Sequence, residues 1–366
     1  MITVPPHIDS LRPYQPGKPI EEVERELGIH NVIKLASNEN PFGSSPRAID
    51  AIRRSLGTLE LYPDAGRTLR YLLANKHVIK AENVICGSGS ESIIATALRT
   101  FLGPEDEMIS SAGTFVGFQV LAHISGVKTH YVPHRNYTYD LDRIAAKINE
   151  RTKIIYIANP NNPTGTIVTT NELERFMERV PASVLVVLDE AYYEYARDYP
   201  DYPDSMRWRW NNVLTCRTFS KAHGLAGIRI GYGMAHSEII AALMKTKLPF
   251  EPSIPATAAG VAALDDEEFI AKTVEQNRES LRYFHEEFEQ LDLNFVPSLA
   301  NFVMIDFALQ ETVSRIYGGM LRRGVITRPL SGFGLPHCIR ITTGTTEQNE
   351  RCVAALEEVL AEEIVD

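Results

Sequence analysis

Short apolar runs, rich in β-branched residues, recur along the first two thirds of the chain. The clearest are Val184–Leu188, Lys153–Ala158 and Asn83–Cys86. A run without polar alternation is typical of a strand that is buried on both faces, as in a parallel sheet. Segments with helical spacing lie between these runs. Residues from about 31 to 253 therefore predict an α/β domain, with a mostly parallel sheet and helices on both of its faces.

The pattern changes after three closely spaced prolines, Pro249, Pro252 and Pro255. Apolar residues at helical spacing then predict one face of a long amphipathic helix, which we interpret as core packing: Ile270, Val274, Leu281, Phe284, Phe288 and Leu291. A strand-like segment, further paired strands and a closing acidic helix follow. We expect three parts: an N-terminal arm (1–30), a large domain (31–253) and a smaller α+β domain (254–366).

Composition is that of an ordinary globular enzyme. The 366 residues are 44% hydrophobic and carry a net charge of -10, without a basic block. Such a chain buries a large core, and nucleic-acid binding is disfavoured. The opening residues lack a basic region before a long apolar run, and no stretch has membrane-spanning length, so we expect a cytoplasmic protein with no membrane partner. The four cysteines are scattered without metal-ligand spacing, so we expect no metal and reduced, buried thiols.

Lys221 is the strongest candidate for chemistry. Ser220 precedes it, glycines follow it, and Arg229 lies eight positions further on. A lysine can form an imine with an aldehyde, while serine and arginine can hold a phosphate. The segment thus predicts a pyridoxal 5'-phosphate site, the alternative being a solvated surface lysine.

Polar residues at the ends of the predicted strands supply the other parts of such a site. Asp189 ends the run Val184–Leu188 and could pair with the cofactor's pyridine nitrogen, or it could cap the next helix. Carboxyl ends of parallel strands are where α/β sheets bind ligands. Tyr192 and Asn162 could both hydrogen-bond the ring oxygen, although Asn162 lies in a segment that also reads as a simple turn.

A glycine-serine turn follows the predicted strand Asn83–Cys86. Gly87–Ser92 opens a segment with helical spacing. A helix N-terminus presents free N–H groups and a positive dipole to an anion. The turn, with Ser90 and Glu91, is therefore a candidate phosphate cradle, although such turns are common.

Three motifs in this order resemble fold-type I pyridoxal-phosphate aminotransferases. They are Asn162–Gly165, Asp189–Tyr192 and Ser220-Lys221 with Gly227–Arg229. Segments near both ends are similar to histidinol-phosphate aminotransferases within that family: Leu11–Gly17, Leu35–Gly43, Arg328–Leu330, Gly334–Pro336 and Ile339–Thr342. The resemblance runs from about Leu11 to Gly344.

The resemblance implies a fold-type I enzyme that uses pyridoxal phosphate to convert L-histidinol phosphate and 2-oxoglutarate into imidazole acetol phosphate and L-glutamate. It implies catalytic roles for Lys221, Asp189 and Tyr192. The implied cofactor-binding residues also include Ser90, Glu91, Phe115, Asn162, Ser220, Arg229 and, reaching across the interface of a homodimer, Tyr62. The implied substrate-binding residues are Tyr14, Asn38, Arg328 and Arg340.

Two departures from the family pattern keep other substrates open. Phe115 lies where many relatives carry a tyrosine, and Lys247–Ser253 replaces a stretch that often contains asparagine. An aromatic amino-acid aminotransferase is therefore the nearest alternative. A decarboxylase acting on an amino-acid phosphate is a further alternative, because one fold hosts several reactions.

Overall fold

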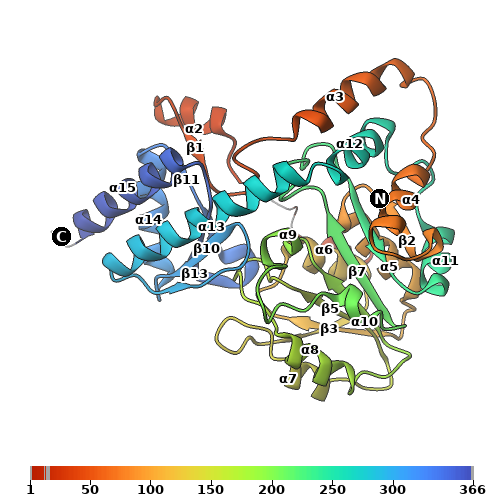
Figure 1. Cartoon of the computed structure of the whole chain (residues 1–366). Helices are drawn as coiled ribbons and strands as arrows, with labels where there is room; N and C mark the ends of the chain where they lie inside the picture. The colour runs from red at the N-terminus through yellow and green to blue at the C-terminus, as the bar shows by residue number, and fades with distance from the viewer. Residues whose placement is uncertain (1, 12, 14–16, 364–366) are drawn as a thin grey trace.

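The computed structural model describes residues 2–11, 13 and 17–363. A seven-stranded sheet forms the centre of the larger part, and a four-stranded sheet forms that of the smaller, C-terminal part (Figure 1). The long helix α13 (Glu267–Gln290) extends from the larger part along the smaller one. The amphipathic helix expected after the three prolines is therefore present.

The seven-stranded sheet is mostly parallel, as predicted. In spatial order its strands are β2 (Val84–Gly87), β8 (Gly231–Met234), β7 (Val213–Thr218), β6 (Leu185–Asp189), β5 (Thr152–Ala158), β3 (Glu107–Ser111) and β4 (Lys128–Val132). Only β8 runs antiparallel to its neighbours. The predicted α/β fold class is confirmed.

Helices cover both faces of this sheet, which explains its continuous apolar runs. Leu185 and Val187 of β6 face one layer, formed by α5 (Ser90–Phe101), α6 (Val116–Ile124) and α11 (Ser237–Thr246). Val186 and Leu188 face the other layer, which includes α7 (Leu141–Ala146) and α8 (Thr170–Met177). Full burial of one such side chain contributes about 1.5–3 kcal/mol. This core fixes the strand ends that carry the polar residues.

The remaining elements of the larger part lie around this core. Helices α4 (Arg67–Lys76) and α12 (Ile254–Leu264) cover the β2 and β8 end of the sheet. The others are α3 (Pro46–Ser55), α9 (Tyr193–Ala196), α10 (Ser205–Trp208), and the 3-10 turns η1 (Leu56–Thr58) and η2 (Ala81–Asn83).

The smaller part has its own antiparallel sheet and core. In spatial order the strands are β12 (Arg328–Leu330), β13 (Leu335–Thr342), β10 (Phe302–Asp306) and β9 (Phe295–Val296), with the turn η3 (Ser331–Phe333) after β12. Helices α13, α14 (Gln310–Arg322) and α15 (Thr346–Glu363) contribute to the core beside it. A separate parallel pair joins β1 (Ile33–Lys34) to β11 (Val325–Ile326).

The N-terminal segment contacts both parts. Val23 of α2 (Ile20–Leu27) packs against Ile326 of the smaller part. The short helix α1 (Pro6–Asp9) lies against α6, where Ser10 Oγ is 3.0 Å from His123 Nε2. The domain boundaries drawn from the sequence stay a prediction.

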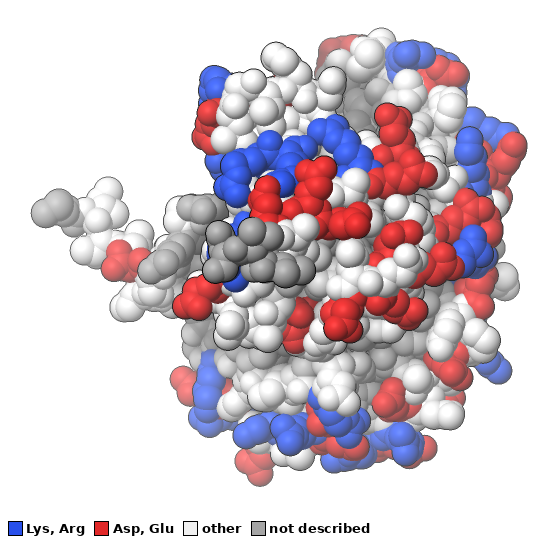
Figure 2. All heavy atoms as spheres, turned by 90° about the vertical axis from the view of Figure 1, so that its left-hand side faces the viewer, with Lys and Arg blue, Asp and Glu red and all other residues white. Residues whose placement is uncertain are grey.

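The face on the side of the smaller part carries many charged side chains of both signs. Figure 2 shows a short basic band with acidic side chains next to it. Ion pairs such as Arg323 with Glu358, 2.7 Å apart, join the two signs in this part of the chain. Within the described ranges, no helix combines the length and the apolar character that a membrane crossing requires.

Candidate active site

A cavity of about 130 Å³ opens at the carboxyl ends of the parallel strands. The strands β5 and β6 both end here, together with β7 and the start of α5. Nine of the residues predicted from the sequence line it: Ser90, Glu91, Phe115, Asn162, Asp189, Tyr192, Ser220, Lys221 and Arg229. Their residue numbers differ by up to 139, so the strand order brings them together.

Asp189 is a buried carboxylate of which one oxygen accepts a hydrogen bond and the other does not. Its Oδ2 accepts a 2.7 Å hydrogen bond from the hydroxyl of Tyr156 on the neighbouring strand. Its Oδ1 is buried and has no hydrogen-bond partner among the described residues. Burial raises the pKa of Asp189 to about 6, although the Tyr156 bond acts in the opposite direction. A buried acceptor of this kind suits a cationic N–H donor such as a protonated pyridine ring.

Lys221 presents its amine to the same cavity. Nζ lies 3.4 Å from the backbone oxygen of Asn38 and 5.7 Å from the centre of the Tyr192 ring. Burial, followed by the positive charges of Arg340 and Arg229, lowers the pKa of Lys221 to about 8. This shift increases the neutral fraction of the amine near neutral pH, and nucleophilic and proton-transfer chemistry require the neutral form.

A cradle for an anion lies at the α5 end of the cavity. Arg229 Nη1 donates to Ser220 Oγ at 3.4 Å, and Arg229 Nη2 lies 4.0 Å from a carboxylate oxygen of Glu91. Gly89 precedes the helix with φ of +88°, and a Cβ there would be 2.7 Å from Arg229 Nη2. The arginine therefore occupies space that only glycine leaves open, beside a helix N-terminus.

The hydrogen bonds of Asn162 and Tyr192 leave both side chains able to donate. Asn162 Oδ1 accepts from Arg340 Nη1, so its amide hydrogens remain for another acceptor. Tyr192 Oη accepts a 2.7 Å bond from Asn38 Nδ2 and keeps its own hydrogen. Burial raises the pKa of Tyr192 to about 12, so the phenol stays protonated at neutral pH. Both groups could thus bind one oxygen on a ring.

Arg340 is a buried cation on strand β13 of the smaller part. It is 4% exposed, donates a 2.8 Å bond to the backbone oxygen of Ala36, and lies 5.2 Å from the ring centre of Phe302. Arg328 is its direct partner across β12 and β13, so the two side chains share one face of that sheet. Two adjacent guanidinium groups provide planar donors for a phosphate or a carboxylate.

Comparison with known proteins decides the family of this chain. The family model for aminotransferases of class I and II matches residues 30–356. The chain belongs to this family. The resemblance seen in the sequence motifs is confirmed, and this chain is a transaminase.

Relatives of this aminotransferase match it over almost its whole length. A histidinol-phosphate aminotransferase 1 of Nitrosococcus oceani is 43% identical, covering 97% of this chain and 96% of that protein. A histidinol-phosphate aminotransferase of Moorella thermoacetica is 44% identical, covering 96% of this chain and 92% of that protein. The solved histidinol-phosphate aminotransferase of Sinorhizobium meliloti, in complex with pyridoxal-5'-phosphate, has a TM-score of 0.88 at 28% identity, covering 98% and 97% of the two chains.

Some predicted site residues lie outside this cavity. Tyr62 is 78% exposed and stacks on Phe250 with ring centres 4.2 Å apart. Asn38 contacts the site through its bonds to Tyr192 and Lys221 rather than as part of the wall. Tyr14 lies outside the described residues. The roles of all these residues stay predictions.

The sequence analysis missed several residues around the cavity. Tyr156, which holds Asp189, is one, and its signal was a hydroxyl within an otherwise apolar strand. The buried pair of Glu190 and Arg217, 2.8 Å apart, is another. Glu190 directly follows the buried strand β6, and Arg217 lies near the end of the buried strand β7; a charged residue in such a position was the available signal. Thr218, a further lining residue, donates a 3.0 Å bond to Ser220 Oγ.

A different group of metal-type ligands lies in the smaller part. Asp306, His337 and Cys338 offer ligand atoms within 4.8 Å of one another. The hydroxyl of Tyr137 is 2.6 Å from Asp306 Oδ2 and 3.4 Å from His337 Nε2. Because this hydroxyl lies between the candidate ligands, we interpret the group as a hydrogen-bonded cluster.

Proposed function

We propose that this aminotransferase uses pyridoxal 5'-phosphate to convert L-histidinol phosphate and 2-oxoglutarate into imidazole acetol phosphate and L-glutamate, a step of histidine biosynthesis. The names of relatives at 43% and 44% identity over nearly the full chain support this substrate. The cofactor in the Sinorhizobium meliloti structure supports the choice of pyridoxal phosphate.

The observation that carries the proposal is the arrangement of Lys221 and Asp189. A partly neutral lysine and a buried carboxylate with an open oxygen line the same cavity. The donor set fits pyridoxal phosphate: the amine suits its aldehyde, the carboxylate suits its ring nitrogen, and the cradle of Ser90, Ser220 and Arg229 suits its phosphate. Phe115 could stack on the ring from the cavity wall.

When bound, pyridoxal phosphate supplies an aldehyde that accepts the amino group and a protonated ring that withdraws electron density from the substrate's α carbon. Asp189 keeps the ring nitrogen protonated through its open oxygen. Asn162 and Tyr192 donate to the ring oxygen, and Tyr192 is itself held by Asn38. Lys221 would accept the proton from the substrate's α carbon, and its lowered pKa favours this role near neutral pH.

We further propose that Arg340, Arg328 and Tyr14 bind the phosphate of histidinol phosphate. The pairing of Arg328 with Arg340 across two strands supports this role, because two guanidinium groups on one sheet face provide several parallel donors. Glu91 would then set the charge near Arg229 at the cofactor end of the cavity.

A homodimer with shared active sites belongs to the same proposal. Tyr62 and Phe250 form a stacked pair on the surface, with Leu59, Leu61 and Leu248 also exposed. Such a group of exposed apolar side chains is typical of a subunit interface. Tyr62 would reach the cofactor phosphate of the partner. Sedimentation at several protein concentrations tests this, and a monomer at all concentrations would contradict it.

We propose a cytoplasmic location as well. The four cysteines are free and buried, as in proteins of a reducing compartment. We also propose the three-part domain division, with boundaries near 30 and 253. The strands before α12 form the seven-stranded sheet, whereas the four-stranded sheet is built from strands that follow α13, which supports the second boundary.

An aromatic amino-acid aminotransferase is the second candidate. The rings of Phe302 and Phe333 lie 5.2 and 5.7 Å from the Arg340 guanidinium, so a carboxylate with an aromatic side chain would meet an apolar surface there. The test is a half-reaction of the cofactor-loaded enzyme without keto acid, following the cofactor absorbance with histidinol phosphate, phenylalanine and tyrosine separately. Rapid conversion by histidinol phosphate alone supports the first function. Equal or faster conversion by the aromatic amino acids supports the second.

Turnover should also require 2-oxoglutarate. A decarboxylase needs no second keto substrate, so product formation and carbon dioxide release in its absence would contradict transamination.

A further inference from the structure

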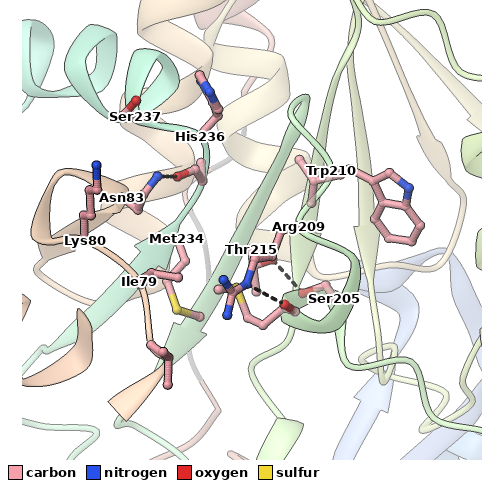
Figure 3. Close-up of a pocket in the computed structure, with 14 residues that line it drawn as sticks. Ile79, Lys80, Asn83, Ser205, Arg209, Trp210, Thr215, Met234, His236 and Ser237 are labelled. Atoms are coloured by element: carbon pink, nitrogen blue, oxygen red, sulfur yellow. Dashed lines mark hydrogen bonds between the residues drawn. The ribbon is translucent and has the colours of Figure 1, made fainter. Parts of the chain in front are cut away.

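A second cavity, of about 470 Å³, lies at the amino ends of the parallel strands, opposite the active cavity; Figure 3 shows its lining residues. It is lined by the start of β7 at Val213 and the end of β8 at Met234, whereas the active cavity lies at the other ends of these strands. Along β7 the nearest lining residues of the two cavities, Thr215 and Thr218, are three positions apart, which corresponds to roughly 10 Å. A ligand here would not touch the cofactor or the substrate.

The charged side chains that line this cavity are cationic, and the other polar lining side chains include the neutral Asn83, Ser205, Thr215 and Ser237. Lys80, Arg209 and His236 line it, and none of the described lining residues is acidic. His236 Nδ1 accepts a 3.4 Å bond from the amide of Glu238, so Nε2 carries the ring hydrogen and can donate. Figure 3 shows Lys80 and His236 on the β2 and β8 side, and Arg209 with Ser205 and Thr215 on the β7 side.

The charges of Lys80 and Arg209 are not neutralised within the described structure. Arg209 bonds only to backbone oxygens, those of Met206 at 3.2 Å and His77 at 3.1 Å. No described carboxylate forms an ion pair with Arg209 or Lys80. In a chain of net charge -10, a cavity with cationic donors and no acidic wall attracts anions.

Arg209 is held in an unusual backbone conformation. Its φ is +51°, in the left-handed region, where this residue ends the short helix α10. The two bonds of its guanidinium to carbonyl oxygens fix the side chain against the surface of the cavity. This helix end places the exposed guanidinium of Arg209 beside the cavity.

The rest of the wall is apolar. Ile79, Val213 and Met234 line it, whereas the ring of Trp210 points away from these residues (Figure 3) and stacks on Trp208 with centres 5.0 Å apart. An apolar pocket with a few convergent polar groups is the usual form of a small-molecule site. The ligand therefore needs both a negative group and an apolar body.

We propose that this cavity binds a small aromatic anion, with its phosphate or carboxylate between Arg209 and Lys80. Its ring would lie against the apolar wall of Ile79 and Met234, and His236 would donate a further bond. This site is separate from the active cavity, and the proposal does not depend on which amino donor the enzyme uses.

The chain offers its own reporter for this site. Its two tryptophans, Trp208 and Trp210, directly precede and follow Arg209 in the chain, so a ligand bound by Arg209 should change tryptophan emission. Phenyl phosphate, titrated into the holoenzyme, should change the emission saturably. Inorganic phosphate should act only at higher concentration, and benzyl alcohol should give no saturable change. The cofactor absorbance, followed in the same titration, reports any binding at the active cavity.

Variants assign the response to the cationic donors. Arg209→Gln should weaken phenyl phosphate binding about tenfold or more, because a charge-assisted bond is lost. Lys80→Gln removes an exposed charge that has no partner in the fold, so it should fold normally and weaken binding roughly threefold. Arg207→Gln is the matched control, since Arg207 is exposed on α10 and does not line the cavity. It should bind as the unmodified enzyme does.

Three results would overturn the proposal. The first is an emission that does not respond to phenyl phosphate. The second is a response that is equal in the Lys80→Gln, Arg207→Gln and unmodified proteins. The third is a response that follows the cofactor absorbance alone. Because these readouts use emission rather than turnover, they stand apart from the test of the proposed reaction.

Discussion

The hydroxyl of Tyr156 donates a 2.7 Å hydrogen bond to Oδ2 of Asp189 from the neighbouring strand. Tyr156 is itself fixed by stacking on Phe118, with ring centres 3.8 Å apart. This contact decides which oxygen of Asp189 remains open to the cavity, and it stabilises the charged form of a carboxylate whose pKa burial raises to about 6. Tyr156 therefore acts as a positioning residue for the group proposed to hold the ring nitrogen.

Replacing Tyr156 with phenylalanine tests this relationship. The variant keeps the ring and its stacking but removes the donor, so the pKa of Asp189 should rise further. A larger neutral fraction of Asp189 then weakens the contact with a protonated ring, and we expect cofactor affinity to fall about tenfold. The loss should grow as the pH falls toward 6. Cofactor dissociation constants, measured spectroscopically across pH, provide the check.

Tyr202→Phe is the matched control for this prediction. Tyr202 is also buried, and its hydroxyl donates a 2.7 Å bond to the backbone oxygen of Asn159 rather than to Asp189. It should lower the free energy of unfolding by about 1 kcal/mol without changing the pH dependence of cofactor binding. Equal cofactor affinity in the Tyr156 variant and the unmodified enzyme at every pH would contradict the positioning role.

Lys221→Ala should abolish transamination while leaving part of the cofactor affinity. The phosphate cradle of Arg229 and Ser220 and the carboxylate of Asp189 remain in this variant, whereas the amine that transfers the proton is lost. Steady-state rates with histidinol phosphate and 2-oxoglutarate, together with cofactor binding by absorbance, measure the two effects. Lys245→Ala, an exposed lysine on α11, is the control and should keep full turnover. Substantial turnover by the Lys221 variant would remove the residue from the mechanism.

The lowered pKa of Lys221 also has a stability consequence in the cofactor-free enzyme. The folded pKa is about 8 against 10.5 for an ordinary lysine, so the unfolded chain binds more protons between these values. The free energy of unfolding therefore increases as the pH rises from 8 toward 10.5. Below pH 8 the buried charge of Lys221 destabilises the folded state. Lys221→Met removes that cost, so we expect a gain of about 1–3 kcal/mol at pH 7.

Urea denaturation of the cofactor-free proteins at pH 7 and pH 10 measures this gain. The difference between the Lys221→Met variant and the unmodified enzyme should shrink at the higher pH. Lys245→Met, on the surface of α11, should give no gain at either pH. A Lys221→Met variant that is less stable at pH 7 would mean that the lysine contributes more through its contacts than its burial costs.

The strand ends explain how much of this site the sequence could predict. Asp189 ends one buried apolar run and Asn162 lies shortly after another, and parallel strands bring their carboxyl ends to one edge, whereas Ser220 was predicted from its place beside Lys221. Local pattern was sufficient for these residues. The same logic predicted the strands and helices, because burial on two faces leaves a continuous apolar run in the sequence.

Residues that act within a strand could not be found in this way. Tyr156 reaches Asp189 only because β5 and β6 pair with Ala158 opposite Asp189, and this register is a tertiary property. The pairing of Arg328 with Arg340 likewise depends on the register of β12 and β13. Tyr62 is exposed in the single chain, so the role proposed for it would require a second subunit. The cavity around Arg209 combines segments without any shared motif.

Gly89 provides a test of the anion cradle. With φ of +88° and Arg229 Nη2 only 2.7 Å from a Cβ position, Gly89→Ala should displace the guanidinium and strain the turn before α5. We expect cofactor affinity to fall about tenfold, because a charge-assisted contact to its phosphate is weakened. Gly103→Ala is the control, since its Cβ would meet its nearest atom at 3.4 Å. Binding of pyridoxal phosphate and of phosphate-free pyridoxal distinguishes the cause, because only the former should weaken.

Arg340 separates the two candidate substrates. Arg340→Gln should lower kcat/KM for histidinol phosphate about 100-fold, which corresponds to about 2.7 kcal/mol, because paired bonds to the phosphate are lost. Arg340→Lys should recover only part of this, since an ammonium group cannot donate two parallel bonds. Arg282→Gln, exposed on α13, should leave kcat/KM unchanged. If Arg340→Gln instead impairs phenylalanine more than histidinol phosphate, the arginine binds a carboxylate, and the aromatic amino-acid function replaces the one proposed.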